Sequence, residues 1–480
     1  QFRHLHGIGV REILGQRRPD HRFVVFVHAG HRPALPINDF RGALGETHFA
    51  AVVQNLEADP RRLIRLGVDV GQVREVDRGL LLDDAAGAFG TGTGMAFYHV
   101  DSLHEGAVSI CQNAQDFALF TLMPGLCDAH VHVTAGTASF PDLLRWSPMY
   151  TTARASEILL GMLQRGFTTV RDCGGADYGL AKAIEEGYIT GPRLLFSGHA
   201  ISQTGGHGDM RGPGENWDSC TCCAGLGVIV DGVSQVRRAC RDEIRKGAHF
   251  IKIMAAGGVA SPTDRIGNTQ FSEEEITAAV QEAEAAETYV AAHVYTARAA
   301  NRALKNGVRS IEHGNLIDDS TIDLLLERDA FLVPTMSTHE VLGTEGVAGG
   351  MPKEMCDKVF EVVDAGKATH AHAHSRGVKM VYGTDLLGPM HRHQLLEFSI
   401  RSAFQSPLEV IASATVTAAE LFNLTEEIGD LSPGKRADII ALAGNPLEDL
   451  GVIQEPEKYL KLVMKDGVIY KNQLISMKTD

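Results

Sequence analysis

His130 and His132, two histidines separated by one residue, are the pair in the chain best suited to chemistry. They follow a Pro124-Gly125 break in the stretch TLMPGLCDAHVHV. On a β-strand, side chains at positions i and i+2 point to the same face, so both imidazoles can reach one point. Imidazole is a common ligand of zinc and other divalent metals. The spacing therefore predicts part of a metal site.

A tightly held catalytic metal needs more than two imidazoles, and further candidate ligands follow along the chain. Each stands in, or at the C-terminal end of, a short strand-like run. They are Lys252 in HFIKIMAAGG, His293 in YVAAHVY, His313 in VRSIEHGN and Asp385 in VKMVYGTD. In a parallel (β/α) barrel the carboxyl ends of all strands open on one face, where active sites are built. The pattern predicts six ligands from five strands that converge there.

Strands and amphipathic helices alternate after the HVH strand. TTARASEILLGMLQRG has apolar residues at helical spacing, and GFTTVRDCGG and RLLFSGHAIS are typical of the second and third strands. Five further strands follow, with a capping box of Ser272 and Glu275 at one helix start and a long helix near residues 352–376. Eight βα units predict an α/β fold, a closed (β/α)8 barrel. A glycine-rich loop, residues 203–227, is predicted to overhang the site.

The two ends of the chain differ from this pattern. In residues 424–480, GDLSPGKRADIIAL and YLKLVMKDGVIYK predict antiparallel hairpins with Pro-Gly and Asp-Gly turns. Residues 1–120 lack a sustained alternation of apolar and polar residues. Three interpretations stay open for this segment: a helix over residues 47–67, a contribution to the small β domain, and an altered N-terminus. We predict a barrel over residues 121–423 and the C-terminal part of a small β domain over residues 424–480.

The composition excludes several classes of partner. The 480 residues have a formal net charge of -15 and a pI near 5.8, so no basic excess is available for nucleic acid or an anionic membrane. No apolar run approaches the roughly 20 residues that span a bilayer, and no signal peptide is visible. The chain begins with Gln1, which leaves room for a missing upstream segment.

The eight cysteines are scattered, which predicts a reducing, cytoplasmic location. Three of them, Cys220, Cys222 and Cys223, lie close together but lack a second pair at zinc-finger spacing. We interpret this segment as a loop with free thiols.

Seven motifs resemble a known family. They are PGLCDAHVHV, SGHAISQTGGHGDM, FIKIMAAGGVASP, AAHVYT, SIEHGNLID, YGTDLLGPMHRHQ and LSPGKRADIIAL. Together they resemble the metal-dependent amidohydrolase superfamily, and more closely its branch of Xaa-Pro dipeptidases (prolidases) and carboxypeptidase-like amidases, which includes ochratoxinase. The resemblance covers residues 121–471. It implies the (β/α)8 barrel together with a small β-sandwich built from the chain termini.

The resemblance also implies a cofactor arrangement. One divalent metal, with zinc as the expected ion, would be bound by His130, His132, Lys252 and Asp385, and a second by Lys252, His293 and His313. A cationic lysine cannot bind a metal, but a neutral lysine can add carbon dioxide to form a carbamate whose carboxylate bridges two ions. Asp385 would act as the general acid and base.

For substrate binding, the resemblance implies His207 and Tyr295 as partners of the scissile amide or its carboxylate. Arg298, which follows nearby, could pair with a free C-terminal carboxylate. Each of the three residues also has an interpretation without a substrate: His207 as a histidine that packs in a loop, Tyr295 as a core tyrosine, and Arg298 as a solvated helix arginine.

Five further histidines occur in repeated patterns. His391 and His393 form a second H-x-H, which we interpret as orienting Asp385 rather than binding a third metal. His370, His372 and His374 lie on a predicted helix, where i and i+2 do not share a face, and we interpret them as solvated surface.

The predicted function is hydrolysis of an amide or peptide bond next to a C-terminal carboxylate. Xaa-Pro dipeptides and N-acyl amino acids, including ochratoxin-like amides, are the small-molecule substrates that the resemblance suggests, with a homo-oligomer as the expected assembly. Two alternatives stay open. One is a cyclic-amide hydrolase or deaminase of the same superfamily, although mononuclear deaminases need no carbamylated lysine. The other is a non-catalytic binding or scaffold protein.

Overall fold

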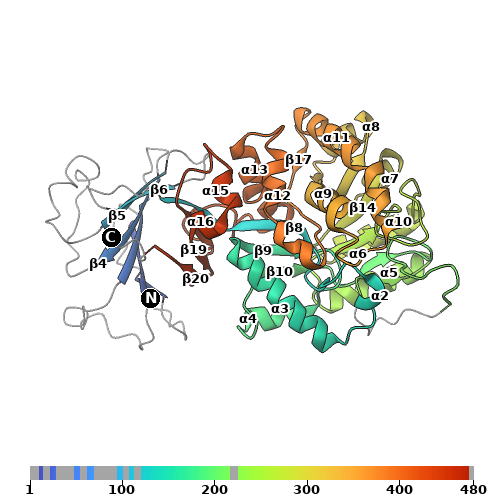
Figure 1. Cartoon of the computed structure of the whole chain (residues 1–480), viewed down its shortest axis with the longest axis horizontal. Helices are drawn as coiled ribbons and strands as arrows, with labels where there is room; N and C mark the ends of the chain where they lie inside the picture. The colour runs from blue at the N-terminus through green and yellow to red at the C-terminus, as the bar shows by residue number, and fades with distance from the viewer. Residues whose placement is uncertain are drawn as a thin grey trace. The chain divides into compact units, whose positions relative to one another are not determined.

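A computed structural model describes the backbone of six N-terminal strands, residues 10–13, 22–28, 48–54, 62–69, 95–100 and 108–112, together with residues 120–216 and 225–474. The chain divides into two compact units. One unit contains residues 1–124 and 430–480, and the other contains residues 125–429 (Figure 1).

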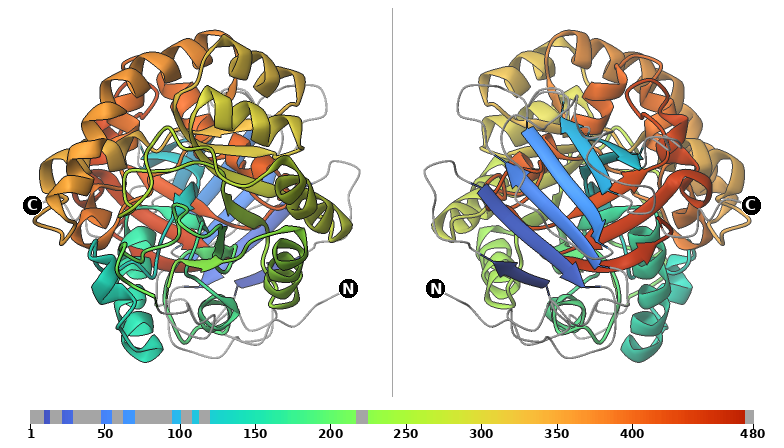
Figure 2. Two further views of the ribbon diagram at one scale, coloured as in Figure 1. Left: turned by 90° about the vertical axis from the view of Figure 1, so that its right-hand side faces the viewer. Right: turned by 90° about the vertical axis from the view of Figure 1, so that its left-hand side faces the viewer.

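The larger unit is an α/β structure with parallel strands. One sheet has the order β10-β9-β8, and a second has the order β12-β11-β13-β14-β15-β16-β17. Figure 2 (left) shows the helices of this unit around its periphery. The strands are β8 (Leu126–Val131), β9 (Phe167–Asp172), β10 (Arg193–Phe196), β11 (Ala200–Ser202), β12 (Gly227–Ile229), β13 (Ile251–Met254), β14 (Val290–Thr296), β15 (Ser310–Leu316), β16 (Phe331–Val333) and β17 (Lys379–Met380).

Most helices of the larger unit lie between successive strands in the chain, and the last ones follow β17. They are α2 (Phe140–Leu143), α3 (Pro148–Gln164), α4 (Tyr178–Glu185), α5 (Val233–Arg245), α6 (Glu273–Ala285), α7 (Ala297–Lys305), α8 (Asp319–Glu327), α9 (Met336–Glu345), α10 (Lys353–Asp357), η2 (Lys358–Glu361), α11 (Val363–Ser375), η3 (Gly388–His393), α12 (Leu396–Arg401), α13 (Pro407–Ser413) and α14 (Val416–Leu421). Ser272 and Glu275 form the predicted capping box of α6.

Backbone hydrogen bonds connect the two parallel sheets. The Ala129 N–H donates to the Tyr382 carbonyl (2.8 Å), which joins β8 to the segment after β17. The His249 N–H donates to the Phe196 carbonyl (2.8 Å), which joins β10 to the start of β13. All residues of β8, β9 and β13 are buried, as expected for parallel strands covered on both faces. These three strands therefore belong to the buried core of the larger unit.

The smaller unit contains one ten-stranded sheet with the order β1-β2-β3-β4-β5-β6-β7-β18-β19-β20, and all its pairings are antiparallel. Figure 2 (right) shows blue strands from the N-terminal part beside red strands from the C-terminal part. A two-sheet sandwich stays a prediction. The elements are β1 (Val10–Ile13), β2 (Arg22–His28), β3 (His48–Gln54), β4 (Arg62–Asp69), β5 (Met95–Val100), β6 (Val108–Gln112), β7 (Phe120–Pro124), β18 (Ile439–Leu442), α15 (Gly451–Gln454), α16 (Pro456–Tyr459), β19 (Leu460–Lys465) and β20 (Val468–Asn472).

Two sequence interpretations are wrong. The helix considered for residues 47–67 is replaced by β3 and β4, which pair in antiparallel register. Pro60 would interrupt such a helix, and the valines on its N-terminal side favour a strand. The long helix expected near residues 352–376 is broken into α10, η2 and α11.

Within the part of the chain that the structure describes, no helix is both long enough and apolar enough to span a bilayer.

Candidate metal centre and active site

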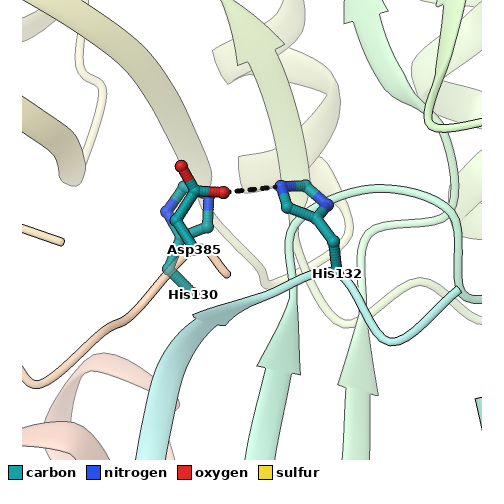
Figure 3. Close-up of side chains that lie close together, drawn as sticks. All are labelled: His130, His132 and Asp385. Atoms are coloured by element: carbon teal, nitrogen blue, oxygen red, sulfur yellow. Dashed lines mark ion pairs between the residues drawn. The ribbon is translucent and has the colours of Figure 1, made fainter. Parts of the chain in front are cut away.

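His130 and His132 lie at the carboxyl end of β8 and face the carboxylate of Asp385 (Figure 3). His132 Nε2 lies 3.2 Å from Asp385 Oδ1, and His130 Nε2 lies 3.5 Å from the same oxygen. These three side chains form a group whose ligand atoms could surround one metal ion. Two imidazole nitrogens and a carboxylate oxygen are a donor set that suits zinc.

Hydrogen bonds on the far side of each ring leave one nitrogen for a metal. His130 Nδ1 donates to Glu312 Oε2 (2.8 Å), and His132 Nδ1 donates to the Gly174 carbonyl (2.9 Å). Both acceptors require a proton on Nδ1, so Nε2 has the lone pair of the neutral ring. Burial, and then the charge of Lys252, lower the pKa of His130 to about 4, so its ring is neutral near pH 7.

His293 and His313, on β14 and β15, complete a group of four imidazoles. The ring centres of His130 and His313 are 5.1 Å apart, and those of His293 and His313 are 4.6 Å apart. His293 Nε2 faces the Gly257 carbonyl (3.3 Å), which leaves Nδ1 for a metal. Burial, and then a neighbouring histidine, lower the pKa values of His293 and His313 well below the usual range.

Lys252 is the buried side chain that fits least well without a cofactor. It is 1% exposed on β13, and among the described residues its Nζ has no hydrogen-bond partner. Its charge contributes to lowering the pKa values of His130, His293 and His313. An isolated buried cation is costly. An orphaned Nζ near four imidazoles and a carboxylate therefore fits a divalent metal site in which Lys252 is converted into an anionic ligand.

Backbone contacts fix the position of Asp385. Its N–H donates to the His130 carbonyl (2.7 Å), and the N–H of the preceding Thr384 donates to Asp128 Oδ1 (3.1 Å). Asp385 has a φ of 53°, a left-handed conformation that costs energy for a residue with a side chain. Burial raises the pKa of Asp385, but the facing His130 and His132 outweigh this effect and lower it to about 2.

A buried ion pair lies behind His130. Arg171 Nη2 donates to Glu312 Oε1 (2.7 Å), and both side chains are fully buried. Ser310 Oγ donates to the same oxygen (2.5 Å), and Arg171 Nε donates to the Ala129 carbonyl (2.6 Å). Burial opposes ionisation, but the charge of Arg171 holds the pKa of Glu312 well below its usual range. Glu312 is therefore an anion that orients His130.

A cavity of about 400 Å³ lies next to the candidate metal ligands. His132, His207, His293, Tyr295 and Asp385 lie in its wall. The described parts of the 203–227 loop line it too, as predicted, whereas Cys220, Cys222 and Cys223 lie outside the described residues. Most of the remaining wall is apolar, from Phe140, Leu143, Leu144, Met210, Leu226, Ile229, Met254, Val259, Leu342 and Leu387.

Two of the three predicted substrate-binding residues face this cavity. The His207 ring stacks on His293 with centres 4.0 Å apart, and Tyr295 stacks on His313 with centres 5.2 Å apart. Arg298 is exposed on α7 and is not among the described residues that line the cavity. The arginine among the described residues that line it is Arg145.

The sequence interpretation missed His339. This histidine follows β16 on α9, is 2% exposed and lines the cavity. Its Nε2 lies 3.0 Å from the Tyr295 hydroxyl. Its place just beyond the end of a predicted strand was a signal that it could belong to the site.

Two interpretations of the other histidines are wrong. His370 is buried, not solvated, and its Nε2 donates to the His313 carbonyl (2.7 Å), whereas His372 is exposed. His391 contacts the Ala135 carbonyl (3.3 Å) and His393 pairs with Glu345 (2.9 Å), so neither orients Asp385 by a hydrogen bond.

The parallel α/β fold and the buried histidine, lysine and carboxylate site define a class of hydrolase. Residues 121–470 match the Amidohydrolase family, and the chain belongs to this family. It is a hydrolase that acts on carbon–nitrogen bonds of amides. Members of this superfamily generally use divalent metals, and the candidate ligands are present.

Three relatives illustrate the similarity. Ochratoxinase of Aspergillus niger is 37% identical over 365 residues, which cover 73% of this chain and 75% of the relative. The solved structure of a prolidase complexed with N-methylphosphonate-L-proline is 45% identical with a TM-score of 0.73, covering 79% of this chain and 95% of that one. A Xaa-Pro dipeptidase with methionine bound in its active site is 29% identical with a TM-score of 0.67, covering 79% and 95% of the two chains.

The Glu312 contact generates a prediction about metal affinity. In Glu312→Gln, the amide oxygen can still accept from His130, but the negative charge that stabilises its Nδ1–H is lost, so metal affinity should fall by about 10- to 100-fold. Metal titration of the apoprotein measures this change. Glu243→Gln is the matched control, because Glu243 is also buried and pairs with a histidine, His199 (3.1 Å). Equal affinities in wild type and Glu312→Gln would contradict the orienting role.

Proposed function

We propose that this chain is a binuclear metal-dependent amidase that cleaves the bond next to a C-terminal carboxylate. The observation on which the proposal depends is the buried, unpartnered Nζ of Lys252 beside the imidazoles. An ammonium there has no compensating contact among the described residues, whereas a carbamate formed from carbon dioxide would be a bridging anionic ligand. His130, His132 and Asp385 would hold one ion, His293 and His313 the other, and modified Lys252 both.

We also propose that the parallel strands close as a (β/α)8 barrel. The hydrogen bonds from Ala129 to Tyr382 and from His249 to Phe196 support closure, since they link the two sheets at both sides of β8, β9 and β10. Closure would bring the carboxyl ends of β8, β13, β14 and β15 to one face. That arrangement is what a shared metal site requires.

The chain's own groups provide the proton transfers. Two divalent ions, when bound, would lower the pKa of a nucleophilic water and polarise the scissile carbonyl. Asp385, ionised and in contact with both histidines, would accept the proton of the attacking water and then donate it to the leaving nitrogen. His207 and Tyr295 would hold the polar atoms of the substrate, and the apolar wall would exclude water from the acyl side.

Substrate choice rests on the cavity. Ochratoxinase and the two proline-specific relatives suggest N-acyl amino acids and Xaa-Pro dipeptides as substrates. Arg145 is the one arginine among the described residues that line the cavity, so we assign it the carboxylate contact first considered for Arg298. A mononuclear deaminase would leave the buried Lys252 unexplained, and a scaffold protein would have no need to keep all six candidate ligands.

Lys252→Ala tests the bridging ligand. Wild-type protein purified without chelator in bicarbonate buffer should contain about two metal equivalents per chain, falling to one or none in Lys252→Ala. Lys252→Glu should retain part of the metal, because it supplies a carboxylate. Elemental analysis measures the content, and Lys379→Ala, which removes a strand lysine paired with Asp329 (2.7 Å), is the control. Unchanged metal in Lys252→Ala would exclude the carbamate.

Asp385→Asn tests proton transfer. The amide keeps the shape of the side chain but cannot accept a proton, so kcat should fall by about 10²- to 10⁴-fold while the protein stays folded. Steady-state kinetics with an N-acyl proline, together with circular dichroism, measure both effects. A wild-type kcat in a folded variant would remove Asp385 from the mechanism.

Arg145→Met tests carboxylate recognition. Losing a charge-assisted contact should raise KM by about tenfold or more for a substrate with a free carboxylate, and should leave its C-terminal amide unaffected. Arg298→Met, a substitution outside the cavity wall, is the control and should behave like wild type. If instead Arg298→Met raised KM and Arg145→Met did not, the original assignment of Arg298 would be the correct one.

A further inference from the structure

The ammonium group of Lys358 lies among three backbone carbonyls of a distant loop. Its Nζ donates to the carbonyls of Gly258 (3.2 Å), Ser261 (2.9 Å) and Asp264 (3.0 Å). Lys358 is the first residue of η2, at the break that separates α10 from α11. An ammonium has three N–H donors, and here all three have an acceptor.

The same loop holds two histidines of the site. Ser261 Oγ lies 2.9 Å from His207 Nδ1, and the Gly257 carbonyl lies 3.3 Å from His293 Nε2. Gly258 packs under the His207 ring so closely that an added Cβ would lie 2.2 Å from it. A shift of residues 257–264 would therefore move both imidazoles.

Lys358 donates to all three carbonyls in a loop that has no regular secondary structure, and the Gly258 carbonyl also accepts from Ser261 Oγ (3.3 Å). Residues 257–264 belong to no helix or strand, and a buried carbonyl needs a donor. The backbone of Lys358 is itself anchored, since Val359 and Val362 beside it are fully buried. The lysine thus connects a packed segment to a loop that is separated from it by about a hundred residues of sequence.

We propose that Lys358 is a positioning residue whose ammonium acts as a built-in monovalent cation, holding residues 257–264 and through them His207 and His293. Its effect on catalysis rests on the proposed function, but the cation site itself does not. Three carbonyls arranged around an ammonium would accept an external ammonium ion once the lysine side chain is removed.

The test is Lys358→Ala, measured by hydrogen–deuterium exchange of the metal-loaded protein. Amides in residues 257–264 should exchange about tenfold faster or more, because the loop loses three charge-assisted bonds. Turnover should fall by about 10- to 100-fold. Methylammonium, which has three N–H donors, should restore both properties, whereas tetramethylammonium, which has none, should restore neither.

Two variants make the result specific. Lys358→Met keeps the side-chain length without the charge, so it should lose loop protection and show no rescue, because the methionine fills the space. Lys353→Ala is the matched control, since Lys353 is on the adjacent helix and pairs with Asp357 (2.6 Å) at the surface. It should leave exchange and turnover unchanged.

Unchanged exchange of residues 257–264 in Lys358→Ala and Lys358→Met would overturn the proposal. Faster exchange that methylammonium does not reverse would also overturn it, because the lysine would then act by packing alone. Hydrogen exchange needs no substrate, so a wild-type protein that fails to hydrolyse N-acyl amino acids would contradict the proposed function while the exchange result still decides the role of Lys358.

Discussion

The site depends on the buried ion pair between Arg171 and Glu312. Two opposite charges with no solvent exposure are costly to bury, and such a pair persists only where other contacts compensate. Here Ser310, the Ala129 carbonyl and the Phe250 ring, whose centre lies 4.8 Å from the guanidinium, supply those contacts. The pair links β9 to β15, and its second carboxylate oxygen extends the link to His130 on β8. One buried charge network therefore fixes the orientation of a candidate ligand and the relative positions of three strands.

Backbone strain occurs near the candidate ligands, within β15 and in the segments that follow β16 and β17. His313, Thr335 and Asp385 have φ values of 73°, 48° and 53°, in the left-handed region that residues with a side chain rarely adopt. Two hydrogen bonds hold these residues: His313 Nδ1 contacts Thr335 Oγ1 (2.7 Å), and the Asp385 N–H donates to the His130 carbonyl (2.7 Å). Left-handed residues that are held in place are typical of sites where side chains must be aimed at one point. The ion pair and these strained residues act together to direct the imidazoles and the carboxylate toward one another.

The sequence predicted the parallel α/β unit and the residues that face one another in it, because both follow from local rules. An H-x-H pair on a strand must share a face, and a polar residue ending a buried strand must lie at the carboxyl edge. Within the site, the errors arose where tertiary packing decides. His370 looked solvated because neither helical spacing nor composition shows that its side of α11 packs on β15, where it meets the His313 carbonyl. Arg145 is a single residue on a segment whose approach to the cavity only the folded chain establishes, whereas the position of His339 just after a predicted strand was a signal that the sequence interpretation did not use.

The residues that the sequence predicted are mainly candidate metal ligands, whereas the residues that it missed lie in the wall of the cavity. Four of the six candidate ligands, His130, Lys252, His293 and His313, stand on strands. The geometry of a strand is fixed by hydrogen-bonded register, such as the pairing of Met254 with His293. The cavity wall that would meet the substrate comes mainly from segments near residues 140–145, 207–215, 225–229 and 338–342. Loops tolerate substitution more readily than strands, and a shared barrel supports many specificities. Relatives as different as an ochratoxinase and a prolidase can therefore share this core. Under the proposed function, the apolar wall would select the acyl group and Arg145 would bind the carboxylate, so the segments that carry these residues would set substrate choice.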